Sequence, residues 1–219
     1  MNASEKWLFA RTLMLAGFSY LAYVLPQNPT LGELGAAIGV IAYLLYEWNL
    51  ATCPKEQLTS ATTWLIWVLI PGAMLAVAAS SGGDGSIPLL VVYVVGTSVI
   101  AITSFIRGAA EKLQMWPDGV AIVVCVAALV VWVAIDDTTT ATLLLCLADG
   151  CGFAILVRGQ WNNPKQEPRL GWAVFLVSTM VTLLAVDWAA FEDWGFMLYV
   201  ACGQTTILLL TRRTSRMGI

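Results

Sequence analysis

Long runs of apolar residues, separated by short polar breaks, fill the chain from one end to the other. A transmembrane helix needs about 20 mostly apolar residues, and eight runs approach or reach that length. They lie at roughly 7–26, 31–50, 61–80, 86–106, 119–135, 139–158, 170–189 and 194–212. The breaks carry Gly, Pro, Asp and Asn, which are typical of turns and loops. The pattern predicts an all-α integral membrane protein with eight transmembrane helices.

Composition excludes the soluble alternatives. Apolar residues make up 59% of the chain and charged residues 11%, whereas a soluble domain has about 45–50% and about 25%. A disordered chain would need low hydrophobicity. The lipid bilayer is therefore the expected surrounding of most of this chain.

Several kinds of chemistry are missing from the sequence. The chain has no histidine, no basic tract, and five cysteines without a C-x-x-C pair. Imidazole catalysis and imidazole metal sites are thereby excluded, and nucleic acid is not an expected partner. The cysteines are interpreted as free buried thiols. We expect no enzyme activity, no catalytic residue, no metal and no cofactor.

Charge in the polar breaks alternates from one break to the next. Basic residues mark the cytoplasmic side of a membrane protein. All of them fall at the ends of the chain or in the even-numbered breaks, namely Lys6, Arg11, Lys55, Arg107, Lys112, Arg158, Lys165, Arg169, Arg212, Arg213 and Arg216. The odd-numbered breaks carry only acidic residues, namely Asp84, Asp136, Asp137, Asp187, Glu192 and Asp193. This segregation predicts that both termini are cytoplasmic and that the number of spans is even.

The two halves of the chain resemble each other. Glu-Trp-Asn at 47–49 has a counterpart in Gln-Trp-Asn at 160–162, and Pro54-Lys55 corresponds to Pro164-Lys165. Apolar sequence often looks self-similar, but these polar landmarks are specific. They indicate an N-terminal four-span repeat and a C-terminal four-span repeat within one membrane domain.

The predicted repeats cover residues 1–110 and 111–219. Because each repeat has an even number of spans, the two copies would have the same orientation in the membrane. Parallel repeats of this kind occur in secondary transporters, where the substrate lies near the bilayer midplane at the repeat interface.

A longer motif carries a resemblance to a known group. It consists of Asp149-x-x-Gly152-Phe153 followed by Arg158, Trp161, Asn163-Pro164 and Glu167. This motif resembles a pattern in a group of small bacterial eight-span proteins, which is itself similar to the PQ-loop, SWEET-like transporter superfamily. The resemblance implies a three-helix bundle used twice, formed here by spans 2–4 and 6–8. It also implies small-solute transport and a bacterial inner membrane.

Asp149 lies at the middle of the sixth span. A charge at that depth costs about 2.5–3.5 kcal/mol on insertion scales, and an intramembrane carboxyl is by default a candidate functional group. It could be a proton site or a hydrogen-bond anchor for a polar solute. Alternatively, a protonated Asp149 could bind a neighbouring helix and serve only to hold the fold together.

Further candidate binding residues lie in spans 3, 4, 7 and 8. The resemblance implies that Gln204 and Thr97 line a pocket, and Thr205 adjoins Gln204. The hydroxyls could instead bond to the carbonyl one turn earlier in their own helices. Indoles can stack on a solute or simply pack in the core; the candidate indoles are those of Trp64, Trp67 and Trp172.

Two functions from different classes remain. The first is a carrier for a small polar solute, with a pocket between two helical bundles. The second is a non-transporting scaffold or accessory subunit, favoured by Ile155, which stands where the group's pattern has proline. A carrier should have a solvent-reachable cavity near the midplane that contains Asp149 and Gln204, whereas a scaffold should pack Asp149 fully against another helix. Self-association and a membrane partner stay open, and Glu47 is expected to form a surface ion pair.

Overall fold

A computed structural model describes residues 30–53, 61–82, 84–107, 137–162 and 167–211, together with scattered residues between 119 and 134. Within these residues the fold is entirely helical. The helices are α2 (Leu31–Thr52), α3 (Ala61–Ser81), α4 (Ile87–Ile106), α6 (Thr138–Asn162), α7 (Arg169–Thr182) and α8 (Phe191–Thr211).

Five of these helices are long and apolar enough to cross a membrane, and α7 is a shorter apolar helix. The predicted helical membrane architecture is therefore confirmed at this level. The predicted span at 7–26 lies outside the described residues, as does most of the one at 119–135. The count of eight spans remains a prediction.

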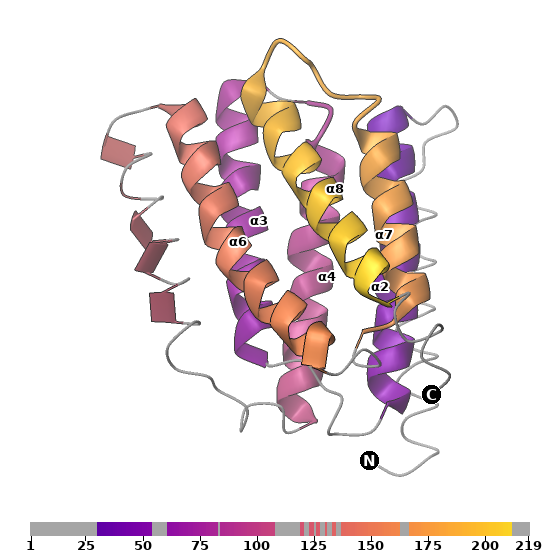
Figure 1. Cartoon of the computed structure of the whole chain (residues 1–219). Helices are drawn as coiled ribbons and strands as arrows, with labels where there is room; N and C mark the ends of the chain where they lie inside the picture. The colour runs from indigo at the N-terminus through magenta and orange to yellow at the C-terminus, as the bar shows by residue number, and fades with distance from the viewer. Residues whose placement is uncertain are drawn as a thin grey trace.

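The six helices form a closed ring. Following the neighbouring pairs, α2 contacts α4, α4 contacts α3, α3 contacts α6, α6 contacts α8, α8 contacts α7, and α7 returns to α2. Figure 1 shows that α2, α4, α6 and α8 run in one direction while α3 and α7 run in the opposite one. Segments far apart in the sequence, such as α2 and α7, thus become direct neighbours.

Small residues allow the helices to approach closely. A Cβ atom at Gly35 of α2 would lie 2.1 Å from Thr182 Oγ1 of α7, and the Ser178 hydroxyl of α7 donates to the Gly35 carbonyl at 2.7 Å. A Cβ at Gly96 of α4 would lie 2.4 Å from the Tyr43 ring of α2. Glycine at these positions brings α2 against α4 and α7, as small residues do in membrane helix interfaces.

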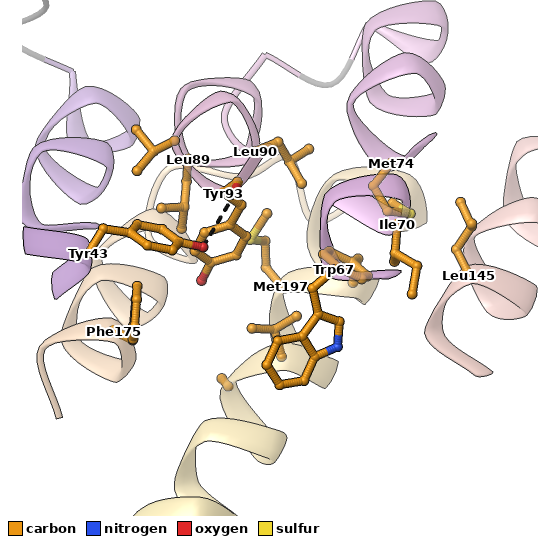
Figure 2. Packing of buried hydrophobic residues seen from close by; sticks show 14 of the residues in the cluster. Tyr43, Trp67, Ile70, Met74, Leu89, Leu90, Tyr93, Leu145, Phe175 and Met197 are labelled. Carbon is orange, nitrogen blue, oxygen red and sulfur yellow. Dashed lines mark hydrogen bonds between the residues drawn. The ribbon is translucent and has the colours of Figure 1, made fainter. Parts of the chain in front are cut away.

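The interior of the ring is filled mainly by aromatic and aliphatic side chains. Figure 2 shows Tyr43 of α2, Tyr93 of α4 and Phe175 of α7 converging from three helices. The Tyr43 and Phe175 rings meet edge to face with centroids 4.6 Å apart. This interior positions the polar groups described below.

Two basic side chains lie at one end of the ring and two acidic side chains at the other. Arg107 follows the last residue of α4 and Arg169 is the first residue of α7, so the helix directions place both at one end (Figure 1). Asp84 and Asp137 precede α4 and α6 at the other end. Hydrogen bonds from the Thr140 side chain and backbone and from the Thr139 amide hold the pKa of Asp137 below its usual value.

The seventh helix is shorter than the span predicted for it. The apolar run predicts a helix over 170–189, but α7 ends at Thr182 and the chain continues in turns. The Leu184 and Ala185 amides bond to carbonyls three residues earlier, the tighter pattern common at helix ends. Beyond them, the Asp193 carboxylate of α8 accepts the Asp187 amide at 2.8 Å and so holds the non-helical segment.

Candidate functional site

A cavity of about 60 Å³ lies within the ring. Each of the six helices contributes at least one residue to the wall, because the cavity lies at the centre of the ring. The lining residues are Tyr43, Trp64, Trp67, Pro71, Tyr93, Thr97, Asp149, Phe153, Trp172, Phe175, Phe196, Val200 and Gln204. Small-molecule sites in proteins are typically concave and mostly apolar, with a few polar groups that fix the ligand's orientation. This cavity has that character.

The structure brings six of the seven predicted binding residues to this one cavity. They are Trp64, Trp67, Thr97, Asp149, Trp172 and Gln204. Thr205 is not among them. It is exposed, and its hydroxyl donates to the Ala201 carbonyl of the same helix at 2.8 Å. One residue further along α8 means a rotation of about 100°, which carries Thr205 away from the side that Gln204 occupies.

Asp149 is nearly enclosed, with 4% of its surface exposed. Its Oδ2 atom has no hydrogen-bond partner among the described residues. The Tyr199 hydroxyl of α8 lies beside the carboxyl group and interacts with it. Asp149 therefore borders a cavity, as expected for a carrier. It also faces a side chain of another helix, which is part of what was expected for a scaffold. None of the residues that line the cavity is a lysine or arginine.

Gln204 belongs to a closed hydrogen-bond network. Its Nε2 donates to the Tyr93 hydroxyl at 3.1 Å, the Tyr93 and Thr179 hydroxyls are 2.7 Å apart, and the Thr179 hydroxyl donates to Gln204 Oε1 at 3.0 Å. The network joins α4, α7 and α8. Gln204 thus borders the cavity, but its amide is largely occupied by protein partners.

The Thr97 hydroxyl is also hydrogen-bonded within its own helix. Its hydroxyl donates to the Tyr93 carbonyl at 2.6 Å, which is the bond to the preceding turn that threonine commonly makes in helices. The Tyr43 hydroxyl also reaches the Tyr93 carbonyl, at 3.5 Å (Figure 2). Thr97 therefore contributes mainly shape to the cavity wall.

Aromatic rings form a continuous part of the cavity wall. The Trp64 and Trp67 centroids are 5.0 Å apart, Trp67 lies 5.3 Å from Phe153, and Phe153 lies 6.3 Å from Trp172. The indole N–H groups of Trp64 and Trp67 are buried and have no hydrogen-bond partner among the described residues. Pro71 lacks an amide hydrogen, so it cannot make the helical bond to the Trp67 carbonyl.

The Trp172 indole is held by Glu167, a residue that the sequence does not single out for the site. Glu167 Oε2 accepts the Trp172 indole N–H at 2.9 Å and the Tyr46 hydroxyl at 2.6 Å. These bonds tie the start of α7 to α2. In the sequence Glu167 stands out only as part of a motif in a polar break, and nothing in that position indicates that its side chain is buried.

Glu47 corrects one sequence expectation. It is 4% exposed, and neither carboxyl oxygen has a hydrogen-bond partner among the described residues. The Thr103 hydroxyl of α4 lies beside it. The expected surface ion pair is therefore wrong, because ring closure covers this part of α2.

Metal binding finds no support in the described part of the chain, where no three Cys, Asp or Glu side chains form a group that could hold an ion. A comparison of the chain with family models, with curated proteins and with solved structures gives no match. What the protein does is therefore inferred from the cavity and its polar atoms.

Proposed function

We propose that the protein is a multi-pass membrane carrier for a small polar solute, which binds in the central cavity. The observation that carries the proposal is the buried Asp149 carboxyl, which borders the cavity with one oxygen unpartnered among the described residues. A carboxyl inside a membrane span is costly and usually marks a solute or proton pathway. A helix bundle that needed Asp149 only for cohesion would gain more by satisfying both of its oxygens.

The order of helices in the ring supports two parallel repeats, residues 1–110 and 111–219. Exchanging α2 with α6, α3 with α7 and α4 with α8 turns each contacting pair into another contacting pair. The pair α2–α4 becomes α6–α8, α3–α4 becomes α7–α8, and α2–α7 becomes α6–α3. In this proposal a pseudo-two-fold axis passes through the cavity, as in parallel-repeat transporters.

The same symmetry favours the resemblance to the PQ-loop, SWEET-like superfamily. Spans 7–26 and 119–135 would each precede one three-helix group, which gives eight spans in total. The basic end of the ring would face the cytoplasm together with both termini. No chemical step is proposed, because Asp149 is the only carboxylate among the lining residues and has no lysine or arginine beside it in that wall.

Solute flux into proteoliposomes tests the carrier function. Purified full-length protein would be reconstituted and offered radiolabelled neutral, cationic and anionic metabolites. We expect saturable uptake of at least one of them, lost in Asp149→Asn. The matched control is Asp84→Asn, which removes an exposed carboxylate outside the cavity and should leave uptake unchanged.

The scaffold alternative predicts a different result. If no solute is taken up and Asp149→Asn is folded and as stable as the wild type, the carrier proposal fails. The protein would then be sought in complexes with other membrane proteins.

A further inference from the structure

Most polar atoms of the cavity already have protein partners. The Gln204 amide is held by Tyr93 and Thr179, and the Trp172 indole by Glu167. Three buried polar atoms remain without a hydrogen-bond partner among the described residues, namely Asp149 Oδ2, Trp64 Nε1 and Trp67 Nε1. All three atoms belong to residues that line the cavity, so one carboxyl and two indoles are the polar groups of the wall that a ligand could partner.

Two of these atoms lie close together on the wall. A Cβ atom at Gly152 of α6 would lie 2.5 Å from Trp67 Nε1, so the indole of α3 lies directly against α6 at this glycine. Asp149 is three residues before Gly152, and residues at that spacing share one face of a helix. The carboxylate acceptor and the indole donor are thus about one helical turn apart.

Aromatic rings surround the same place. Trp67, Phe153 and Trp172 form a triangle with centroid distances of 5.3, 6.3 and 6.4 Å. Phe153 is one turn after Asp149 on α6. A cation within about 6 Å of an aromatic centroid is attracted by the ring quadrupole, and more strongly where water is excluded. An ammonium group beside Asp149 can approach several of these rings at once.

The charge of the wall restricts the ligand further. No lysine or arginine is among the lining residues, so an anionic or zwitterionic ligand would bring a carboxylate with no cation to receive it. A neutral ligand would require Asp149 to be protonated, because an ionised carboxylate without a counter-charge is unfavourable in an apolar setting. A monovalent cation balances Asp149 and suits the rings.

Building on the carrier function above, we propose that the cavity binds a small organic monocation that also carries an oxygen acceptor. An amino alcohol or a quaternary-ammonium alcohol has this chemistry. The ammonium group lies against the Asp149 carboxylate and the rings of Trp67, Phe153 and Trp172. The oxygen accepts the Trp67 indole N–H.

A matched pair of ligands tests the charge requirement without any mutation. Choline and its neutral carbon isostere, 3,3-dimethylbutan-1-ol, have nearly the same shape and the same hydroxyl. Binding of each to the purified full-length protein would be followed by quenching of tryptophan fluorescence. We expect choline to bind at least tenfold more tightly than the isostere. Equal affinities would overturn the proposal.

Variants then locate the binding. Asp149→Asn should weaken choline binding at least tenfold, whereas Asp84→Asn should leave it unchanged. Trp67→Phe keeps a ring but removes the donor, so it should weaken choline more than tetramethylammonium, which has no oxygen. Choline binding that is unaffected by Asp149→Asn would place the ligand elsewhere and overturn the proposal.

The cation class and the carrier function can fail separately. If choline and tetramethylammonium do not bind but a neutral sugar or nucleoside binds and is taken up by proteoliposomes, the cation class is wrong and the carrier stands. If no solute binds and no flux is measured, both are wrong.

Discussion

The contact between Trp67 and α6 depends on Gly152, which has no side chain. A Cβ at Gly152 would meet the Trp67 indole at 2.5 Å, whereas a Cβ at Gly150 would meet its closest neighbour, the Tyr199 hydroxyl, at 3.4 Å. Gly152→Ala should therefore cost about 1–3 kcal/mol of stability through overpacking. Gly150→Ala should be neutral or stabilising by up to about 1 kcal/mol, because alanine is the better helix former.

Thermal unfolding in detergent and tryptophan fluorescence measure this difference. Gly152→Ala should lower the melting temperature and shift the emission of the displaced indole, and Gly150→Ala should do neither. Equal effects of the two substitutions would mean that Trp67 does not lie against α6 at Gly152.

Two buried glutamates should respond differently to substitution. Glu167 accepts bonds from Tyr46 and Trp172, so Glu167→Ala removes the acceptor that these two buried donors share and should cost about 1–3 kcal/mol. Glu47 has no hydrogen-bond partner on either oxygen among the described residues, so Glu47→Gln removes a carboxyl without breaking a bond. We expect its melting temperature to stay the same or rise. A larger loss for Glu47→Gln than for Glu167→Ala would contradict this assignment.

The sequence predicts some of these residues and not others for identifiable reasons. Asp149 and Gln204 stand out because each is a polar group inside a long apolar run. Thr205 is equally polar, but which face of α8 meets the cavity depends on the packing of neighbouring helices. Tyr43 lies in the run before Glu47 with no polar pattern around it, and only ring closure shows that it borders the cavity.

At the scale of elements, the Asp193 carboxylate joins two connections that are distant in sequence. It accepts the Ser86 amide at 2.9 Å, just before α4, and the Asp187 amide at 2.8 Å, after α7. Asp193 is 1% exposed. Because the two oxygens serve two different amides, Asp193→Asn would replace one acceptor by a donor. It should cost about 1–3 kcal/mol.

The test compares Asp193→Asn with Asp84→Asn, an exposed aspartate near the same end of the ring. Unfolding in detergent should show a lower midpoint for Asp193→Asn alone. Hydrogen exchange should increase at residues 183–190, which this carboxylate holds. Unchanged exchange there would mean that the turns after α7 do not need Asp193.

Helix lengths show how far hydropathy alone predicts elements. It locates α2, α3, α4, α6 and α8 because each covers most of one apolar run, although four of them extend a few residues beyond it. It misplaces the end of α7 because residues 183–186 are apolar as well, and nothing local distinguishes them from a helix. The turn there arises from contacts with α8 and with Gly85, where a Cβ would lie 2.4 Å from the Ala185 carbonyl oxygen.

For the whole molecule, closure of the ring explains where apolar side chains are exposed. Large exposed hydrophobic residues occur on several helices, among them Leu65, Val95, Ile102, Leu147 and Val177. This is the surface expected of a protein whose polar groups face inward and whose outside meets lipid.

The proposed orientation in the membrane makes a prediction about the two ends of the ring. Ser81, the last residue of α3, and Thr52, the last residue of α2, are both exposed and lie at opposite ends. In a variant whose native cysteines are replaced, Ser81→Cys should react with a membrane-impermeant maleimide added to intact cells. Thr52→Cys should react only after the membrane is opened, because the basic end would face the cytoplasm. The reverse labelling pattern would invert the proposed topology. Labelling of both positions in intact cells would mean that the ring does not span the bilayer, and the carrier function would lose its basis.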